Sequence, residues 1–110
     1  MIVEYIRYKL DEAATQPAAN GLNLFEAAYL EAAASLDTSA HCRGYELSRC
    51  VEEKDRYILR IEWDSLEGHM QGFRRAPEFA PFFAAIKPYI ARIEEMQHYA
   101  VSSIAATKRA

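Results

Sequence analysis

The sequence has little of what marks several large classes of protein. It holds two cysteines in 110 residues and carries a net charge of −3. No apolar run approaches the ~18 residues that suggest a membrane-spanning helix, and adjacent basic residues occur only at Arg74–Arg75 and Lys108–Arg109. The sequence therefore disfavours a membrane-spanning protein and a nucleic-acid-binding protein.

The two cysteines, Cys42 and Cys50, match no metal-binding spacing. The first residues of the chain alternate polar and apolar side chains, unlike a signal peptide. Without an export signal, cysteines are normally reduced thiols. We therefore expect a cytoplasmic protein with two free thiols, and neither a disulfide nor a zinc site.

What the sequence does contain is typical of a globular domain. Hydrophobic residues make up 51% and charged residues 26%, which is enough for a modest core. The length predicts one domain over residues 1–110, of which about 103–110 form a loose C-terminal tail. Seven tyrosines and five phenylalanines are many for this length, so some rings are expected to line a pocket or an interface.

Four segments have the alternation of β-strands, namely residues 2–9, 43–51, 56–63 and 93–101. The first strand has one face that carries Ile2, Ile6 and Tyr8. The third strand has one face that carries Tyr57, Leu59, Ile61 and Trp63. The charged segment EEKD between the second and third strands predicts a hairpin.

Helices are predicted in the two long connections. Asn23 and Glu26 have the spacing of a capping box. The apolar stripe that follows, which predicts a helix ending near residue 40, consists of Phe25, Ala28, Tyr29, Ala32 and Leu36.

The second connection is predicted to hold two helical segments. Asp64 is predicted to cap a short helix on which His69 shares an inward stripe with Leu66, Met70 and Phe73. Pro77 suits the first turn of the next segment, whose apolar side carries Phe79, Phe82, Phe83 and Ile86.

The predicted order of elements is β-α-β-β-α-β. Short connections and right-handed crossovers favour a four-stranded antiparallel sheet with the helices on one face, a ferredoxin-like α+β fold. A partly apolar exposed face is typical of an association surface, so we expect a homodimer whose sheets pack face to face. The other sheet face is expected to carry Val3, Tyr5, Ile58 and Met96 among Arg7, Arg60 and Glu62.

Two stretches, RIEWDSLEGHMQGFRRAPEFAPFF and IEEMQHY, together with this order of elements, resemble the antibiotic biosynthesis monooxygenase (ABM) family. The resemblance covers nearly the whole chain. It implies a dimeric α+β barrel with a pocket between sheet and helices. Reactions in the family range from cofactor-free oxygenation of polyketide quinol precursors to oxidative haem degradation, so the fold leaves the reaction open.

His69 is the candidate catalytic residue. It points back at the sheet near Trp63, and the resemblance implies that both border the pocket. An imidazole with an ordinary pKa of ~6.5 can take a proton from a phenol near neutral pH, and a phenolate gives an electron to O2 more readily than the phenol does. The alternatives are a core histidine bonded to a backbone carbonyl, and a pocket residue without proton transfer.

The candidate substrate-pocket residues are Trp63, Phe73, Phe82, Phe83 and Tyr89. Each of these rings has the simpler alternative of a core aromatic residue.

The remaining charged candidates have plainer interpretations. His98 is expected at an interface or a sheet edge, and His41 in a loop. Arg74 and Arg75 are expected to form a solvated helix end, with the alternative of steering an anionic substrate.

The haem-degrading branch of the family fits poorly. Resemblance to that branch would require an asparagine on the first strand, a tryptophan ending the third, and an axial histidine in the later helical region. Trp63 matches, but the first strand has no asparagine and the later region holds Phe82 and Phe83.

We therefore expect a monooxygenase that acts on a phenolic or quinol-like aromatic small molecule without metal, flavin or another cofactor. The second hypothesis is a non-enzymatic module that binds an apolar ligand or a redox partner. The third is a haem-binding protein.

Overall fold

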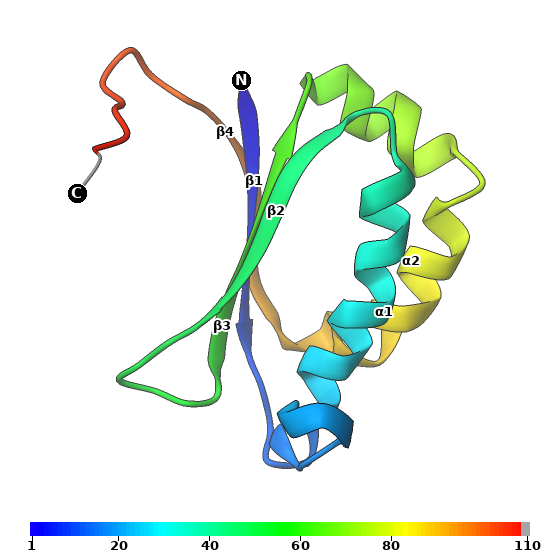
Figure 1. Ribbon diagram of the computed structural model, residues 1–110, viewed down its shortest axis with the longest axis vertical. Coiled ribbons are helices and arrows are strands. Elements are labelled where there is room, and N and C mark those ends of the chain that lie inside the picture. The colour runs from blue at the N-terminus through cyan, green and yellow to red at the C-terminus, as the bar shows by residue number, and fades with distance from the viewer. Residues whose placement is uncertain (109–110) are drawn as a thin grey trace.

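The computed structural model describes residues 1–108 and has the predicted order of strands and helices. Four antiparallel strands form one sheet in the order β2-β3-β1-β4, and α1 (Leu24–Thr38) and α2 (Phe79–Ile86) cover one of its faces (Figure 1). The ferredoxin-like α+β fold is therefore confirmed. The strands are β1 (Ile2–Lys9), β2 (Cys42–Arg49), β3 (Arg56–Trp63) and β4 (Ile93–Ala100).

Shorter helical turns join these elements. Turns of 3-10 helix span Ala13–Thr15, Ala19–Gly21, Phe73–Arg75 and Lys87–Arg92, and a π-helical turn spans Gly68–Gly72. Within residues 1–108, no helix combines the length and the apolar character needed to cross a membrane. After β4, residues 101–108 form no helix or strand and lead away from the sheet (Figure 1). The last part of the predicted tail, 109–110, lies outside the described residues.

The start of α1 is the predicted capping box. The backbone N–H of Glu26 donates to Asn23 Oδ1 at 2.7 Å, and the backbone N–H of Asn23 donates to Glu26 Oε1 at 3.2 Å. Two of the N–H groups that a helix start leaves unpaired are thereby satisfied. The buried side of α1 carries most of the predicted stripe, with Phe25, Tyr29, Ala32 and Leu36.

The core lies between the sheet and the helices. The helix-facing side chains of β3 are those predicted, and none is more than 3% exposed: Tyr57, Leu59, Ile61 and Trp63. Ile6 and Tyr8 of β1 join them, as expected for an antiparallel neighbour with the same pleat.

The predicted short helix differs from the structure in two respects. Ser65, not Asp64, caps it, because Ser65 Oγ accepts from the backbone N–H of Gly68 at 2.8 Å, while Asp64 bonds to His41. The π-helical turn changes the rotation per residue, and the predicted stripe is wrong at Leu66, which is 49% exposed. Met70 is 37% exposed but still lines the space between the sheet and α2.

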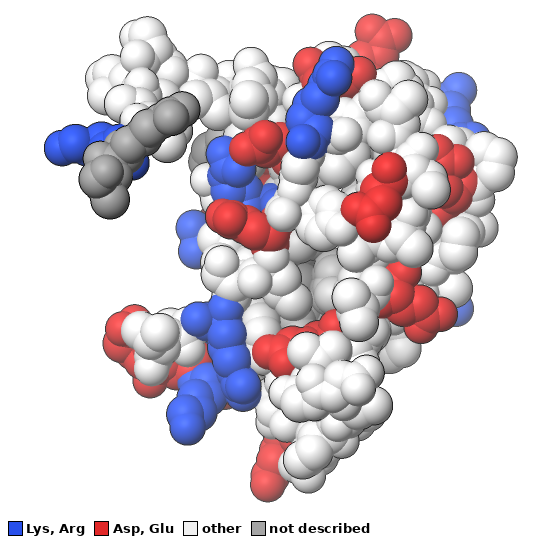
Figure 2. Space-filling model, in the orientation of Figure 1, with Lys and Arg blue, Asp and Glu red and all other residues white. Residues whose placement is uncertain are grey.

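The sheet face away from the helices mixes apolar and charged side chains, as predicted. Tyr5 and Tyr99 pack edge to face, and Arg7 pairs with Glu95. Met96 was expected here, but it pairs with Ile6 and therefore points to the helix side. On the face that Figure 2 presents, basic and acidic side chains lie near one another rather than separating by sign, in keeping with ion pairs such as Arg56–Glu94.

Candidate active site

A cavity of about 300 Å³ lies between the sheet and α2. Its walls are mainly apolar, and a cluster of titratable side chains closes one side. Four of the five predicted pocket rings line it: Trp63, Phe73, Phe82 and Phe83. His69 lines it as well. Tyr89 is not among the lining residues, and its ring instead packs edge-on against Phe25.

The titratable cluster consists of Glu4, His69 and His98. His69 Nδ1 lies 2.6 Å from His98 Nε2, a hydrogen-bonding distance. His69 Nε2 is 3.7 Å from Glu4 Oε1, and His98 Nε2 is 4.0 Å from Glu4 Oε2. Glu4 and His69 are 3% and 7% exposed, so the interactions within the cluster are poorly screened by water.

Strand pairing brings two of these residues together. Glu4 stands directly opposite His98 in the antiparallel β1–β4 ladder, so both side chains share the helix-facing side. Trp63, at the end of β3, donates from Nε1 to Glu4 Oε1 at 3.1 Å. The indole therefore orients the carboxyl group from the neighbouring strand.

His69 reaches the cluster from the π-helical turn. Its imidazole stacks on the Trp63 indole, with centroids 4.4 Å apart and planes 12° from parallel. Glycine permits the turn to pack closely, because a Cβ at Gly72 would lie 2.3 Å from His41 Nε2. His41, in the predicted loop, is itself held by Asp64 at 2.9 Å. The His41–Asp64 pair lies beside Gly68 and Gly72 of this turn, and His41 does not line the cavity.

Burial determines how the cluster titrates. Burial raises the pKa of Glu4 to about 7, against the lowering effects of the Trp63 hydrogen bond and the charge of Arg74. Burial, followed by the charges of His98 and Arg74, lowers the pKa of His69 to about 4. Burial and Arg74 also lower the pKa of His98. Near neutral pH both imidazoles are therefore neutral, and Glu4 is the group that exchanges its proton most readily.

This arrangement can accept and pass on a proton inside an apolar cavity. The 3.7 Å between His69 Nε2 and Glu4 is longer than a hydrogen bond. A hydroxyl of a bound molecule can therefore approach Nε2 when Nδ1–H donates to His98. The three side chains can also supply metal ligands, since one ligand atom from each lies within 4.8 Å of the others.

Sequence reasoning missed two of the three members of the cluster. His98 does lie on the edge strand β4, as expected, but its bond to His69 was not predicted. Glu4 could have been found from the alternation of β1, because it occupies the inward position between Ile2 and Ile6. His98 needed the pairing register of β4 with β1, which no local pattern provides.

Arg74 and Arg75 are both exposed, as expected for a solvated helix end, and Arg74 also lines the cavity. The Arg74 guanidinium lies over the Phe79 ring, 5.7 Å from its centroid. This position is compatible with the hypothesis that Arg74 steers an anionic substituent.

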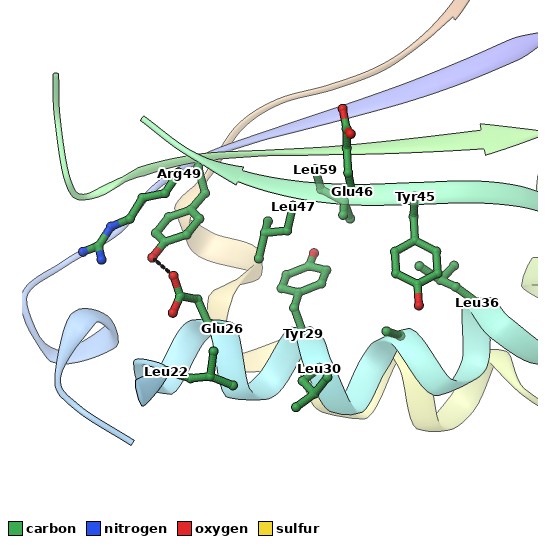
Figure 3. A pocket seen from close by; sticks show the side chains of 12 residues that line it. Leu22, Glu26, Tyr29, Leu30, Leu36, Tyr45, Glu46, Leu47, Arg49 and Leu59 are labelled. Atoms are coloured by element: carbon green, nitrogen blue, oxygen red, sulfur yellow. Dashed lines mark hydrogen bonds between the residues drawn. The ribbon is translucent and has the colours of Figure 1, made fainter. Parts of the chain in front are cut away.

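A second hollow, of about 410 Å³, lies between α1 and β2 (Figure 3). Several of its polar groups are paired within the protein: Tyr57 donates to Glu26 at 2.6 Å, and Tyr45 donates to Asp37 at 2.6 Å. Tyr29 bonds to the buried hydroxyl of Tyr8. Within residues 1–108, no histidine lines this hollow. The cavity beside α2 is therefore the better candidate for chemistry.

The fold and this cavity define a small α+β domain with a proton-accepting cluster on one side of an apolar chamber. The sequence model of the antibiotic biosynthesis monooxygenase family matches residues 1–85. The uncharacterized protein YczJ of Bacillus subtilis (strain 168) is 32% identical over 75 residues, which are 68% of this chain and 79% of the relative. The chain belongs to the antibiotic biosynthesis monooxygenase family.

Solved structures agree on the fold. A candidate antibiotic biosynthesis monooxygenase from Bordetella bronchiseptica superposes with a TM-score of 0.73 at 22% identity, covering 92% of this chain and 96% of its own. SnoaB, a cofactor-independent oxygenase from Streptomyces nogalater, superposes with a TM-score of 0.67 at 15% identity, covering 96% and 97%. At such identities the likeness concerns the fold and leaves the reaction open.

The raised pKa of Glu4 predicts a pH-dependent stability. The folded state holds the Glu4 proton up to about pH 7, whereas the ordinary value is 4.5. The contribution of Glu4 is therefore fully present at low pH and is lost as the pH rises through about 7. Relative to the wild type, Glu4→Gln should gain about 2–3 kcal/mol in free energy of unfolding between pH 5 and pH 8.

Urea unfolding of both proteins in chelator-treated buffer measures this difference. His69 has the opposite slope, because its lowered pKa costs stability as the pH falls below about 6.5. Because His69 is present in both proteins, its contribution largely cancels from the difference between their free energies of unfolding. Glu62→Gln, on the outer face of β3, is the matched control and should follow the wild type. Parallel pH curves for wild type and Glu4→Gln would contradict the assignment.

Proposed function

We propose that the protein is a cofactor-independent monooxygenase that acts on a phenolic or quinol-like aromatic small molecule. The proposal rests on His69, which lines an apolar cavity, lies 2.6 Å from His98 through Nδ1, and has Nε2 3.7 Å from Glu4. Membership of the family and the likeness to the fold of SnoaB support the same reaction class.

The cavity suits such a substrate in size and lining. A volume of about 300 Å³ is at the small end of ligand pockets and fits a molecule of one or two aromatic rings. Phe82 and Phe83 line the cavity with aromatic rings, which suit contact with an aromatic substrate. Exclusion of water protects the reactive intermediate from side reactions.

His69 and Glu4 have distinct roles in the proposed reaction. His69 Nε2 takes the proton of the substrate hydroxyl. Because its pKa of about 4 makes it a weaker base than an ordinary imidazole, the step depends on the Glu4 carboxylate, which stabilises the imidazolium that forms. His98 accepts from Nδ1–H and thereby holds the tautomer that leaves Nε2 free. A proton shared among these groups can return to the departing oxygen atom.

The overall chemistry balances without an external reductant. With 1-naphthol as the probe, the naphtholate gives an electron to O2, and the ring carbon para to the oxygen forms a bond with the reduced oxygen. The O–O bond then breaks as that carbon loses its hydrogen. One oxygen atom stays on the ring as 1,4-naphthoquinone and the other leaves as water. The substrate supplies both electrons and both hydrogens of that water.

We further propose that the protein works as a cytoplasmic homodimer. The mixed face of the sheet, with Val3, Tyr5, Ile58 and Tyr99 among paired charges, supports association of two sheets. Cys42 and Cys50 stand at opposite ends of β2, roughly 26 Å apart along the strand, and are unpaired. Two free thiols fit a reducing compartment.

Size-exclusion chromatography with light scattering tests the dimer. Two chains of 12.5 kDa should give a particle of about 25 kDa at micromolar concentration. Tyr99→Glu, which adds a charge to the mixed face, should shift the mass toward the monomer. A wild-type mass of one chain that persists at high concentration would rule out the homodimer.

The catalytic role of His69 predicts a large loss of turnover on substitution. Oxygen uptake and naphthoquinone formation from 1-naphthol should fall roughly 10²–10⁴-fold in His69→Ala, with ¹⁸O2 labelling the new carbonyl. His41→Ala is the matched control, because His41 lies outside the cavity, and it should keep most of the activity. Thermal melts establish that both variants are folded.

Two results would assign the protein to another class. Quenching of Trp63 fluorescence by 1-naphthol without oxygen uptake would favour the ligand-binding module. A Soret band after haem addition, lost in His69→Ala, would favour a haem-binding protein. Unchanged turnover in folded His69→Ala would remove His69 from the mechanism.

A further inference from the structure

The cluster beside the cavity has the composition of a transition-metal site. Two imidazoles and one carboxylate, from Glu4, His69 and His98, offer ligand atoms that all lie within 4.8 Å of one another. They come from β1, the π-helical turn and β4, so the sheet pairing and the packing of the turn hold them together. Divalent first-row ions bind this combination of two nitrogen ligands and one oxygen ligand, and leave further positions open.

We propose that Glu4, His69 and His98 form a binding site for one divalent first-row transition ion per chain. The inference goes beyond the proposed oxygenase activity and does not depend on it. Metal binding and proton transfer use the same nitrogen lone pairs, so a bound ion would exclude the proton-accepting state of the histidines.

The distances between the side chains are close to those of a metal site. Metal–ligand bonds of about 2.0–2.2 Å put neighbouring ligand atoms about 3–3.5 Å apart. One ligand atom from each side chain lies within 4.8 Å of the others, and His98 Nε2 is 4.0 Å from Glu4 Oε2. The ligand atoms therefore have to close by about 1 Å, and His98 is the most movable member because its side chain is 24% exposed on an edge strand.

Two features of the surroundings favour a bound ion, and one opposes it. Trp63 Nε1 donates to Glu4, which is the kind of outer contact that orients a ligating carboxylate. The cavity leaves room for water or a small ligand at the open positions. Arg74 also lines the cavity, and its positive charge opposes a cation.

Titration of the chelator-treated, full-length protein with Co²⁺ tests the proposal without substrate. One equivalent should bind with visible absorption bands of low-coordinate Co²⁺, and Zn²⁺ should displace it. Glu4→Gln retains an oxygen that can accept from Trp63 but removes the charge, and it should weaken binding at least about tenfold. His98→Gln, at the more exposed position, should do the same and provides a second test if Glu4→Gln does not fold.

One control variant and one matched pair of variants distinguish this site from surface binding. His41→Ala removes the histidine of the His41–Asp64 pair and should leave the Co²⁺ spectrum and affinity unchanged. Arg74→Gln should tighten binding, whereas Arg75→Gln should not. No Co²⁺ band, or a band that survives in folded Glu4→Gln and His98→Gln but disappears in His41→Ala, would overturn the proposal. Because no oxygenation is measured, failure here leaves the proposed activity standing.

Discussion

The burial of one carboxyl group governs the arrangement of the candidate site. Glu4 lies on the apolar side of β1 and is 3% exposed. An isolated ionised carboxylate in such a place is costly, so it needs a donor, a proton or a cation. Trp63 Nε1 supplies the donor, and His69 and His98 lie within 4.0 Å of its oxygens. The end of β3, the π-helical turn and the middle of β4 must therefore converge on one point.

The regular elements could be predicted from sequence because their signals are local. The alternation of β3 predicted its bounds and its buried face without error, and the Asn23–Glu26 spacing predicted the start of α1. The short helix after Trp63 could not be predicted in detail, because an inserted π-helical turn changes which residues face inward. His69 and Phe73 remain buried, while Leu66 and Met70 do not.

The candidate site was only partly predictable, since it depends on strand pairing. His69, Trp63 and three phenylalanines could be assigned to one cavity only because the family resemblance implied a pocket beside their stripes. Glu4 was visible in the alternation of its own strand, but an acidic residue among apolar ones was not recognised as inward-facing. His98 becomes meaningful only once β4 is paired with β1 in the register that sets it opposite Glu4. Such long-range pairing has no local sequence signature.

The same three side chains account for both proposals. Near pH 7 the neutral imidazoles lie beside the Glu4 carboxyl group, which is close to half-protonated because its pKa is about 7. Such a cluster can move protons, and it can also bind a divalent ion. Which of these states dominates depends on metal availability and on the charge of Arg74. The apolar rings of the cavity serve either state, because they exclude water and shape the space for an aromatic molecule.

Burial keeps His69 neutral beside a Glu4 carboxyl group that loses its proton near pH 7. Long-range ¹H–¹⁵N NMR of the imidazole nitrogens, recorded from pH 5.5 to 8.5 in metal-free buffer, measures both protonation states. The account predicts that His69 stays neutral across this range, with a protonated Nδ1, and that its ¹⁵N shifts follow a step near pH 7 that is absent in Glu4→Gln. An independent His69 titration near pH 6.5, unchanged by Glu4→Gln, would contradict the account.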